Sequence, residues 1–136
     1  MSLSLAARDI MTASVVTVAP DTSLEDLTEL LAQSTFSGVP VVDYLGRVVG
    51  IVTEADLLMS RPGQHTVESV MTRDVVAVSV DESLQEIAFL LSVRRINRVP
   101  VLEDGKLVGI ISRADVVKAL AGKLTSTRTP SAESSP

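Results

Sequence analysis

The stretch Gly50–Leu58, GIVTEADLL, returns later in the chain as Gly109–Val117, GIISRADVV. In each copy a glycine precedes two β-branched residues, a hydroxyl residue follows them, and an aspartate stands three positions after the hydroxyl. β-branched residues favour strands. A hydroxyl residue followed three positions later by an acid is typical of the capping box that starts a helix. Each copy therefore predicts a strand that runs directly into a helix.

Both copies belong to a longer tandem repeat. Met11–Ser60 aligns with Met71–Ala119, with one residue missing from a turn in the second copy, and most paired residues are identical or conservatively exchanged. Self-similarity over this length indicates a duplicated structural unit. We assign four regions: repeat 1 (8–60), a linker (61–68), repeat 2 (69–121) and a disordered tail rich in Ser, Thr and Pro (122–136).

The two repeats predict the same order of elements. In repeat 1, residues 15–18, 39–43 and 47–52 are expected to be strands, and helices are expected over 24–31, capped by Ser23, and after Thr53. In repeat 2 the strands are expected at 75–78, 99–103 and 106–111, and the helices over 84–91, capped by Ser83, and after Ser112. The short turn makes the second and third strands antiparallel neighbours. The fold class is α/β of the α+β type, with two β-α-β-β-α repeats packed with pseudo-twofold symmetry, because about 50 residues bury too little surface to be stable alone.

The composition limits the classes of function. The 136 residues are 46% hydrophobic but only 2% aromatic, so the core must be aliphatic, although Phe36 and Phe89 are expected in the core or an interface. The absence of Cys excludes disulfides and Cys-based zinc sites and fits a reducing cytoplasm. A net charge of −5 without a basic run argues against nucleic-acid binding. No apolar run approaches the roughly 20 residues of a membrane span, and the start lacks a secretory signal, so a cytoplasmic location is expected.

Catalytic chemistry finds little support in the sequence. The single histidine, His65, lies in the linker, and no nucleophile stands beside a base. The acids Glu25, Asp26 and Glu29 are expected on a solvated helix face rather than around a metal. We therefore expect no enzyme activity, no catalytic residue and no metal site.

The two hydroxyl–aspartate pairs, Thr53 with Asp56 and Ser112 with Asp115, allow two interpretations. Each pair can serve only as a helix cap, which contributes on the order of 1 kcal/mol. Each can also bind a ligand, because a helix start presents free N–H groups to anions and a carboxylate accepts hydrogen bonds from the two hydroxyls of a ribose. Gly50 and Gly109 would let a ligand or a neighbouring strand approach closely. A ligand-free interaction module therefore stands as the alternative to a ligand-binding one.

The complete pattern resembles the CBS (cystathionine β-synthase) domain, which occurs in pairs as a Bateman module. The matching segments are DIMTASVVTV and SVMTRDVVAV at the repeat starts, SGVPVVD and NRVPVLED in the middle, and GIVTEAD and GIISRAD at the ends, within residues 8 to 120. The resemblance implies a stand-alone regulatory module that binds AMP, ADP, ATP or S-adenosylmethionine in two clefts between the repeats. It implies no required cofactor, with Mg²⁺ accompanying the ligand if that ligand is ATP.

The resemblance also assigns roles to individual residues. Asp56 and Asp115 would bind ribose hydroxyls, and Thr53 and Ser112 would lie near the phosphate or ribose. The segments before the prolines would contact base and phosphate, and the first strands would border the base; these candidates are Ser37, Gly38, Val39 and Thr17 in repeat 1, and Asn97, Arg98, Val99 and Ala77 in repeat 2. Repeat 2 adds Arg113 beside its hydroxyl, where repeat 1 has Glu54, and Arg98 where repeat 1 has Gly38. We therefore expect the second site to take a nucleotide and the first to bind more weakly or to take a less charged adenosine ligand.

The resemblance further implies how the module would act. Ligand binding would change its conformation and so its affinity for an effector protein in trans. Two copies would form a disc-like homodimer through apolar helix faces, with Leu58, Met59, Val117 and Leu120 as contributors.

Overall fold

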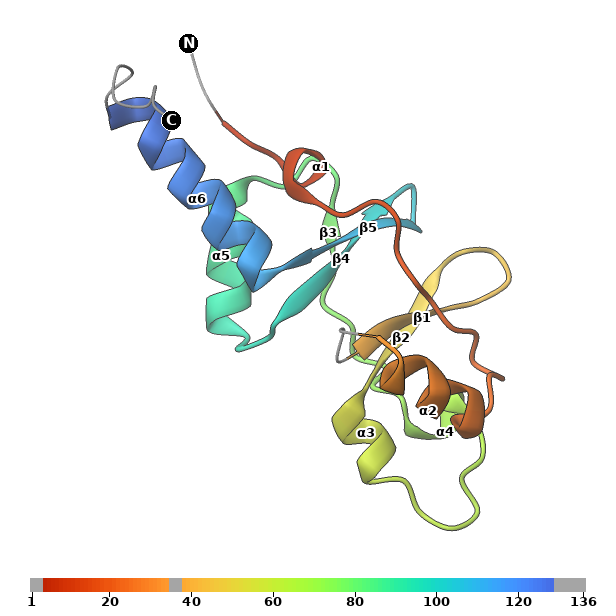
Figure 1. Ribbon diagram of the computed structural model, residues 1–136. Helices are drawn as coiled ribbons and strands as arrows, with labels where there is room; N and C mark the ends of the chain where they lie inside the picture. Colours follow the sequence, from red (N-terminus) through yellow and green to blue (C-terminus); the bar gives the residue numbers. More distant parts are fainter. Residues whose placement is uncertain (1–3, 35–37, 129–136) are drawn as a thin grey trace. The chain divides into compact units, whose positions relative to one another are not determined.

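A computed structural model describes residues 4–34 and 38–128 (Figure 1). The chain is of the α+β class, with small sheets and short helices. Its elements follow in the order α1 (Ala7–Ile10), α2 (Leu24–Ala32), β1 (Gly38–Val42), β2 (Val48–Thr53), α3 (Glu54–Leu58), α4 (Val67–Val70), β3 (Val78–Ser79), α5 (Leu84–Val93), β4 (Arg98–Glu103), β5 (Lys106–Ser112) and α6 (Arg113–Arg128).

The chain forms two compact units whose limits cross the sequence repeats. Unit 1 contains the residues up to Ala13, Ala77–Val101 and the residues from Gly109 onward, and unit 2 contains Ser14–Val76 and Leu102–Val108. The opening residues of each repeat, with those just before them, therefore pack in the unit built mainly from the other repeat. We call residues 4–13 and 64–73 the leading segments.

The two leading segments form equivalent backbone hydrogen bonds. In unit 1, Thr12 and Ile110 exchange hydrogen bonds of 2.9 and 3.0 Å between their backbone N–H and carbonyl groups. In unit 2, Thr72 and Ile51 exchange the same pair at 2.8 and 2.9 Å. The leading segment 4–13 therefore lies along β5, and the leading segment 64–73 lies along β2.

This close approach favours glycine at two positions. A Cβ added at Gly50 would lie 2.6 Å from Met71 Sδ and 2.9 Å from the carbonyl oxygen of Thr72. A Cβ added at Gly109 would lie 2.9 Å from Met11 Cγ, with Met11 Sδ closer still. The sequence left open whether a ligand or a neighbouring segment approaches these glycines, and the structure places a leading segment against each of them.

The second and third strands pair as predicted, but the first strands are shorter than predicted. β1 and β2 are antiparallel, with Gly38 opposite Thr53 and Val39 opposite Val52, and β3, β4 and β5 form a sheet in that order. The strand expected at 15–18 is wrong, because Val18 alone bridges Val41 in parallel. Val18 donates to the Pro40 carbonyl and accepts from Val42 N–H. Continuing this ladder toward residue 16 would need an N–H on Pro40, which proline lacks.

The starts of α2 and α5 agree with the prediction from the sequence, and the structure differs from it in the tail and the linker. Ser23 Oγ accepts the N–H of Asp26 at 3.0 Å, and Ser83 Oγ accepts the N–H of Glu86 at 3.1 Å, so both predicted caps form. α6 extends to Arg128, within the segment predicted as a disordered tail. The predicted linker also enters the fold, because Val67 is fully buried at the start of α4.

The core is aliphatic among the described residues, as the composition predicts. In unit 2 it joins α2, both strands and the leading segment, and its buried members are Val18, Leu27, Leu31, Val39, Val41, Val52, Val67 and Met71. Phe89 does not contribute to a core, because 62% of its surface is exposed. Phe36 and Ser37 lie outside the described residues.

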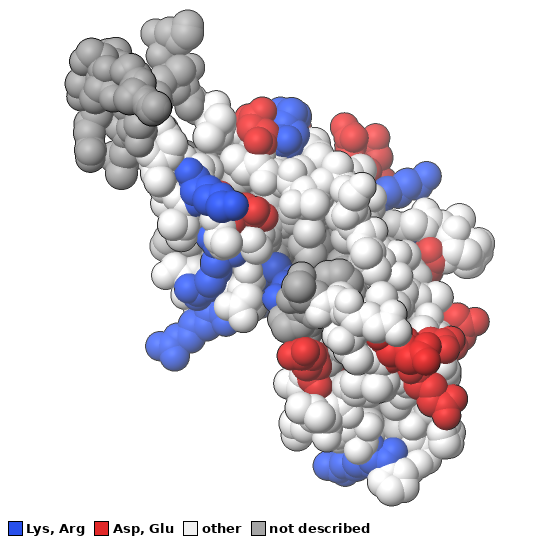
Figure 2. Space-filling model, viewed as in Figure 1, with Lys and Arg blue, Asp and Glu red and all other residues white. Residues whose placement is uncertain are grey.

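Charge is distributed unevenly over the chain. Figure 2 shows acidic side chains gathered over α2, whose first turn contains Glu25 and Asp26, and basic side chains near the end of α5 and along α6. The exposed cations there include Arg94, Arg95 and Lys118. Among the described residues, no helix combines the length and apolar character that crossing a bilayer requires.

Candidate functional site

The Ser112–Asp115 pair forms a reciprocal capping box where β5 runs into α6. The Ser112 N–H donates to Asp115 Oδ2 at 2.9 Å, and the Asp115 N–H donates to Ser112 Oγ at 3.1 Å. Both residues are half-buried. The cap involves Oδ2, so the carboxylate keeps its second oxygen, Oδ1, as a further hydrogen-bond acceptor.

The Thr53–Asp56 pair has the same backbone geometry but a different hydroxyl bond. The Thr53 N–H donates to Asp56 Oδ2 at 2.9 Å, and the Asp56 N–H donates to Thr53 Oγ1 at 3.2 Å. In addition, the Thr53 hydroxyl donates its proton to Asp56 Oδ2 at 3.1 Å. Within the described part of the chain, the corresponding bond from Ser112 to Asp115 is not formed. A ligand would therefore compete with Asp56 for the Thr53 proton, whereas no such bond must be broken at Ser112.

In each unit, the hydroxyl–aspartate pair lies beside the start of the strand that precedes the short turn. We call this strand, β1 in unit 2 and β4 in unit 1, the central strand. Gly38 at the start of β1 is opposite Thr53 at the end of β2. In unit 1 the N–H of Arg113, next to Ser112, donates to the Asn97 carbonyl at 2.9 Å, just before β4. Within each unit, the hydroxyl–aspartate pair and the start of the central strand are therefore neighbours.

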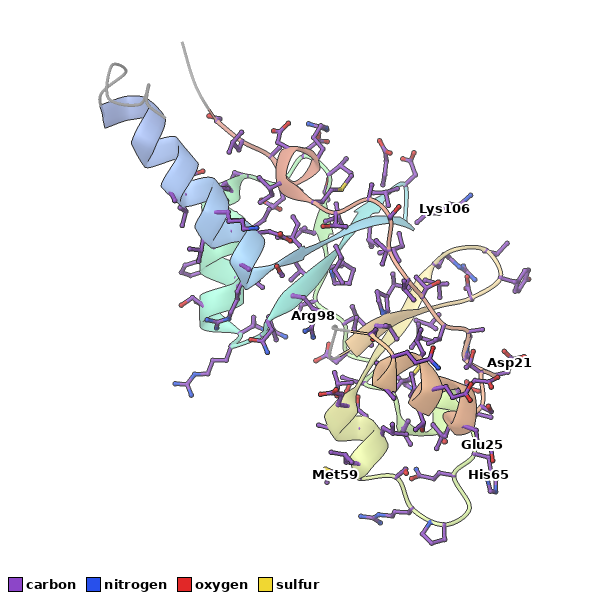
Figure 3. All side chains as sticks on the ribbon, in the orientation of Figure 1. Asp21, Glu25, Met59, His65, Arg98 and Lys106 are labelled. Atoms are coloured by element: carbon purple, nitrogen blue, oxygen red, sulfur yellow. The ribbon has the colours of Figure 1, made fainter. Side chains whose placement is uncertain are left out.

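The central-strand residues differ in what they can offer a ligand. Val39 and Val99 are 2% and 0% exposed, so only their backbones could contact one. Arg98 lies at the start of β4 and is half-buried (Figure 3), while its counterpart Gly38 has no side chain. A guanidinium suits phosphate recognition because its planar fork can form two parallel hydrogen bonds.

Arg113 forms contacts that the sequence interpretation missed. Its Nε donates to the Ile96 carbonyl at 3.1 Å, and its Nη2 donates to the Leu91 carbonyl at 3.5 Å. The guanidinium therefore lies against the end of α5 and the loop that follows. A signal was present in the sequence: a cation at the first residue of a helix opposes the helix dipole, so it needs another reason to be there.

No described contact joins the two first-strand candidates, Thr17 and Ala77, to the hydroxyl–aspartate pairs. Ala77 is half-buried and immediately precedes β3. Thr17 lines an open depression together with Asp21, Asp43 and Glu68, near the last residue of β1. Thr53 lies instead opposite the first residue of β1, about 13 Å away along a five-residue strand. The contacts described for Thr17 therefore lie toward the opposite end of that strand from Thr53.

One carboxylate has a clearly shifted acidity, and it lies in a turn rather than in a candidate site. The Arg47 backbone N–H and the Arg47 side chain both donate to Asp43, as does the Leu45 N–H. These bonds, led by the Arg47 N–H, hold the pKa of Asp43 below its usual value.

The chain is similar to known proteins over most of its length. The CBS domain family matches residues 7–63 and 67–122. YhcV, a CBS domain-containing protein of Bacillus subtilis, is 30% identical over 114 residues, which cover 80% of this chain and 81% of YhcV. Other curated relatives include an inosine-5′-monophosphate dehydrogenase of Methanocaldococcus jannaschii, 33% identical over 113 residues. The match covers 82% of this chain but 23% of that enzyme, so the chain spans about a quarter of such relatives.

Solved structures of similar chains contain adenosine compounds. The structure of CBSX2 in complex with AMP has a TM-score of 0.80 and 32% identity, over 88% of this chain and 98% of that chain. The CBS domain pair of MJ0100 in complex with 5′-methylthioadenosine and S-adenosyl-L-methionine has a TM-score of 0.78 and 29% identity, over 88% and 98% of the two chains. With two matching domains that together span most of its length, the chain belongs to the CBS domain family.

Proposed function

We propose that this chain is a stand-alone regulatory module that binds an adenosine-containing ligand, such as AMP, ADP, ATP or S-adenosylmethionine. The observation that carries the proposal is the arrangement found in both units. An aspartate forms a capping box with a hydroxyl residue at a helix start, and this pair lies beside the first residues of the central strand. The AMP and S-adenosylmethionine complexes of similar CBS pairs support this ligand class.

The chemistry of the Ser112–Asp115 pair fits a nucleoside phosphate. The Asp115 carboxylate can accept hydrogen bonds from both ribose hydroxyls, since Oδ1 is outside the cap and Oδ2 has a further lone pair. The Ser112 hydroxyl and the Arg98 guanidinium can donate to a phosphate, and Asn97 and Val99 offer backbone groups. At the Thr53–Asp56 pair the hydroxyl proton is already bonded, and Gly38 replaces the arginine. We therefore assign the nucleotide to the Ser112–Asp115 pair. We assign weaker binding, or a less charged adenosine ligand, to the Thr53–Asp56 pair.

Binding would regulate a partner protein in trans rather than support catalysis by this chain. A ligand shifts a conformational equilibrium only by as much as its affinities for the two states differ. We also propose a homodimer through apolar helix faces. Leu58 and Met59 at the end of α3 are 83% and 76% exposed, and Val117 in α6 is 63% exposed. Figure 3 labels Met59 at the end of α3. The cytoplasmic location remains a prediction from the sequence.

Calorimetric titration with AMP, ATP, adenosine and S-adenosylmethionine tests the ligand proposal. Asp115→Asn is the informative variant, because its amide oxygen can still accept the Ser112 N–H while the second carboxylate oxygen is replaced by an amide donor. We expect it to keep the thermal stability of the parent and to lose AMP binding. The matched variant Asp56→Asn should retain the tighter binding event. No binding of any of the four ligands would favour the ligand-free interaction module.

Sedimentation tests the dimer. Met59→Glu places a charge on an exposed apolar position, so it should leave the fold intact and shift the mass to that of a monomer. A parent chain that sediments as a monomer at high concentration would exclude the homodimer without bearing on ligand binding.

A further inference from the structure

Arg113 occupies a position where a cation is unfavourable for its own helix. It is the first residue of α6, where the dipole is positive and acidic residues are preferred. Repeat 1 has Glu54 at the equivalent first residue of α3, in agreement with that preference. The arginine therefore breaks a local rule that its counterpart obeys, which points to a role outside α6.

The guanidinium lies at the opposite pole of a neighbouring helix. Just after α5, Arg95 has a positive φ of 54°, the Ile96 N–H donates to the Leu91 carbonyl and the Arg95 N–H donates to the Ser92 carbonyl. These bonds form the Schellman motif that closes many helices. Arg113 Nη2 adds a donor to the same Leu91 carbonyl, at the negative end of α5 where a cation is favourable.

Arg113 also holds the loop that leads from α5 into β4. Its Nε donates to the Ile96 carbonyl at 3.1 Å and its backbone N–H donates to the Asn97 carbonyl at 2.9 Å. Three donors of one residue therefore bond three carbonyls within Leu91–Asn97. Arg98, the candidate phosphate ligand, follows directly in the chain.

We propose that Arg113 is a positioning residue for the Ser112–Asp115 site: it fixes the Ile96–Val99 backbone and does not itself bind phosphate. This inference rests on the proposed function, because the site it serves is the proposed nucleotide site. Glu54 cannot take the same role in repeat 1, since a carboxylate has no proton to donate. The sequence indicates that the two sites differ in the charge that they offer a phosphate. On this proposal, part of the difference is instead how the backbone at the start of the central strand is held.

The proposal predicts equal effects on ligands with and without phosphate. Arg113→Gln should weaken adenosine and AMP by the same factor, about tenfold if the binding-competent loop falls to about a tenth of the population. Arg113→Lys keeps the charge but lacks the planar fork, so it should behave like Arg113→Gln. Arg94→Gln, which removes an exposed cation at the end of the same helix, serves as the matched control and should bind like the parent.

Hydrogen exchange of the free protein supplies a readout that does not depend on any ligand. The amides of Ile96–Val99 should exchange faster in Arg113→Gln, while the rest of the chain keeps its rates and its melting temperature. Selective loss of AMP with adenosine unchanged, or full rescue by Arg113→Lys, would show a phosphate ligand and overturn the inference. Unchanged exchange would overturn it as well. If the parent binds neither adenosine nor AMP, the proposed function fails, and the exchange experiment still decides whether Arg113 holds the loop.

Discussion

The glycines at 50 and 109 should differ in how well they tolerate alanine, although they are equivalent in the repeats. Neither has a left-handed φ, so close approach alone favours glycine at both positions. At Gly50 an added Cβ meets Met71 Sδ at 2.6 Å and also the backbone oxygen of Thr72 at 2.9 Å. At Gly109 the two nearest atoms, Met11 Sδ and Cγ, belong to a half-buried side chain and can rotate away, which leaves Met11 Cβ at 3.1 Å.

The structure sets the size of each effect. At Gly50 the Thr72 carbonyl must move by about 0.5 Å to reach ordinary contact, which strains the two hydrogen bonds between Ile51 and Thr72. Overpacking costs about 1–3 kcal/mol, and the alanine gains about 0.4–1 kcal/mol by restricting the unfolded chain. We therefore expect Gly50→Ala to lower the free energy of unfolding by about 1–2 kcal/mol, and Gly109→Ala to change it by less than about 1 kcal/mol.

Urea unfolding followed by circular dichroism measures these differences, because the chain has no Trp and its single tyrosine, Tyr44, is 94% exposed. Double-mutant cycles sharpen the test. Met11→Ala should remove most of the penalty of Gly109→Ala and leave only the Cβ contact at 3.1 Å, whereas Met71→Ala should relieve Gly50→Ala less, since the Thr72 carbonyl at 2.9 Å stays. Gly122→Ala, with open space around it in α6, should stabilise the chain by about 0.5–1 kcal/mol. Equal penalties at Gly50 and Gly109, or no coupling with the methionines, would refute the reasoning.

Three further changes test local features of the fold. Arg95→Gly removes a side chain from a left-handed residue, so the free energy of unfolding should rise by about 0.5–1 kcal/mol, and a lower melting temperature would contradict this. Ser83→Ala deprives the Glu86 N–H of its acceptor and should cost about 1 kcal/mol in urea unfolding, with Ser83→Asp restoring the cap. The lowered pKa of Asp43 means that its contribution is complete above its unfolded-state pKa of about 3.9 and is lost as the pH falls through the lower folded value. Asp43→Asn should thus be less stable than the parent at neutral pH, with the difference shrinking below about pH 4; a constant difference would exclude this ionisation as the cause.

Short-range patterns explain what could be predicted of the fold. The helix caps at Ser23 and Ser83 and the leucines that follow them depend on neighbours within one or two turns, and both helices form where expected. The first strands depend on a partner far along the chain. Pro40 interrupts the ladder that residues 15–18 would have joined, and this effect becomes visible only once Val18 is known to lie beside Val41.

The exchange of leading segments could not be predicted for a reason that lies in the repeat itself. Met11–Thr12 and Met71–Thr72 are identical in sequence, and so are the Gly-Ile pairs against which they pack. Either methionine therefore suits either glycine by residue type, and only tertiary packing decides between them. The role of Arg113 escaped prediction similarly, because its acceptors lie on the loop after α5 rather than within its own helix.

The exchange also changes the reason why a single repeat is incomplete. From size alone, about 50 residues bury too little surface to be stable. The structure adds a specific gap: without Met71 and Thr72, β2 would lose the partner of Ile51, and the groove over Gly50 would stand open. That partner belongs to the opening of repeat 2, while the corresponding partner of Ile110 comes from the opening of repeat 1. Each hydroxyl–aspartate pair therefore follows a strand whose edge is covered by residues from the opening of the other repeat.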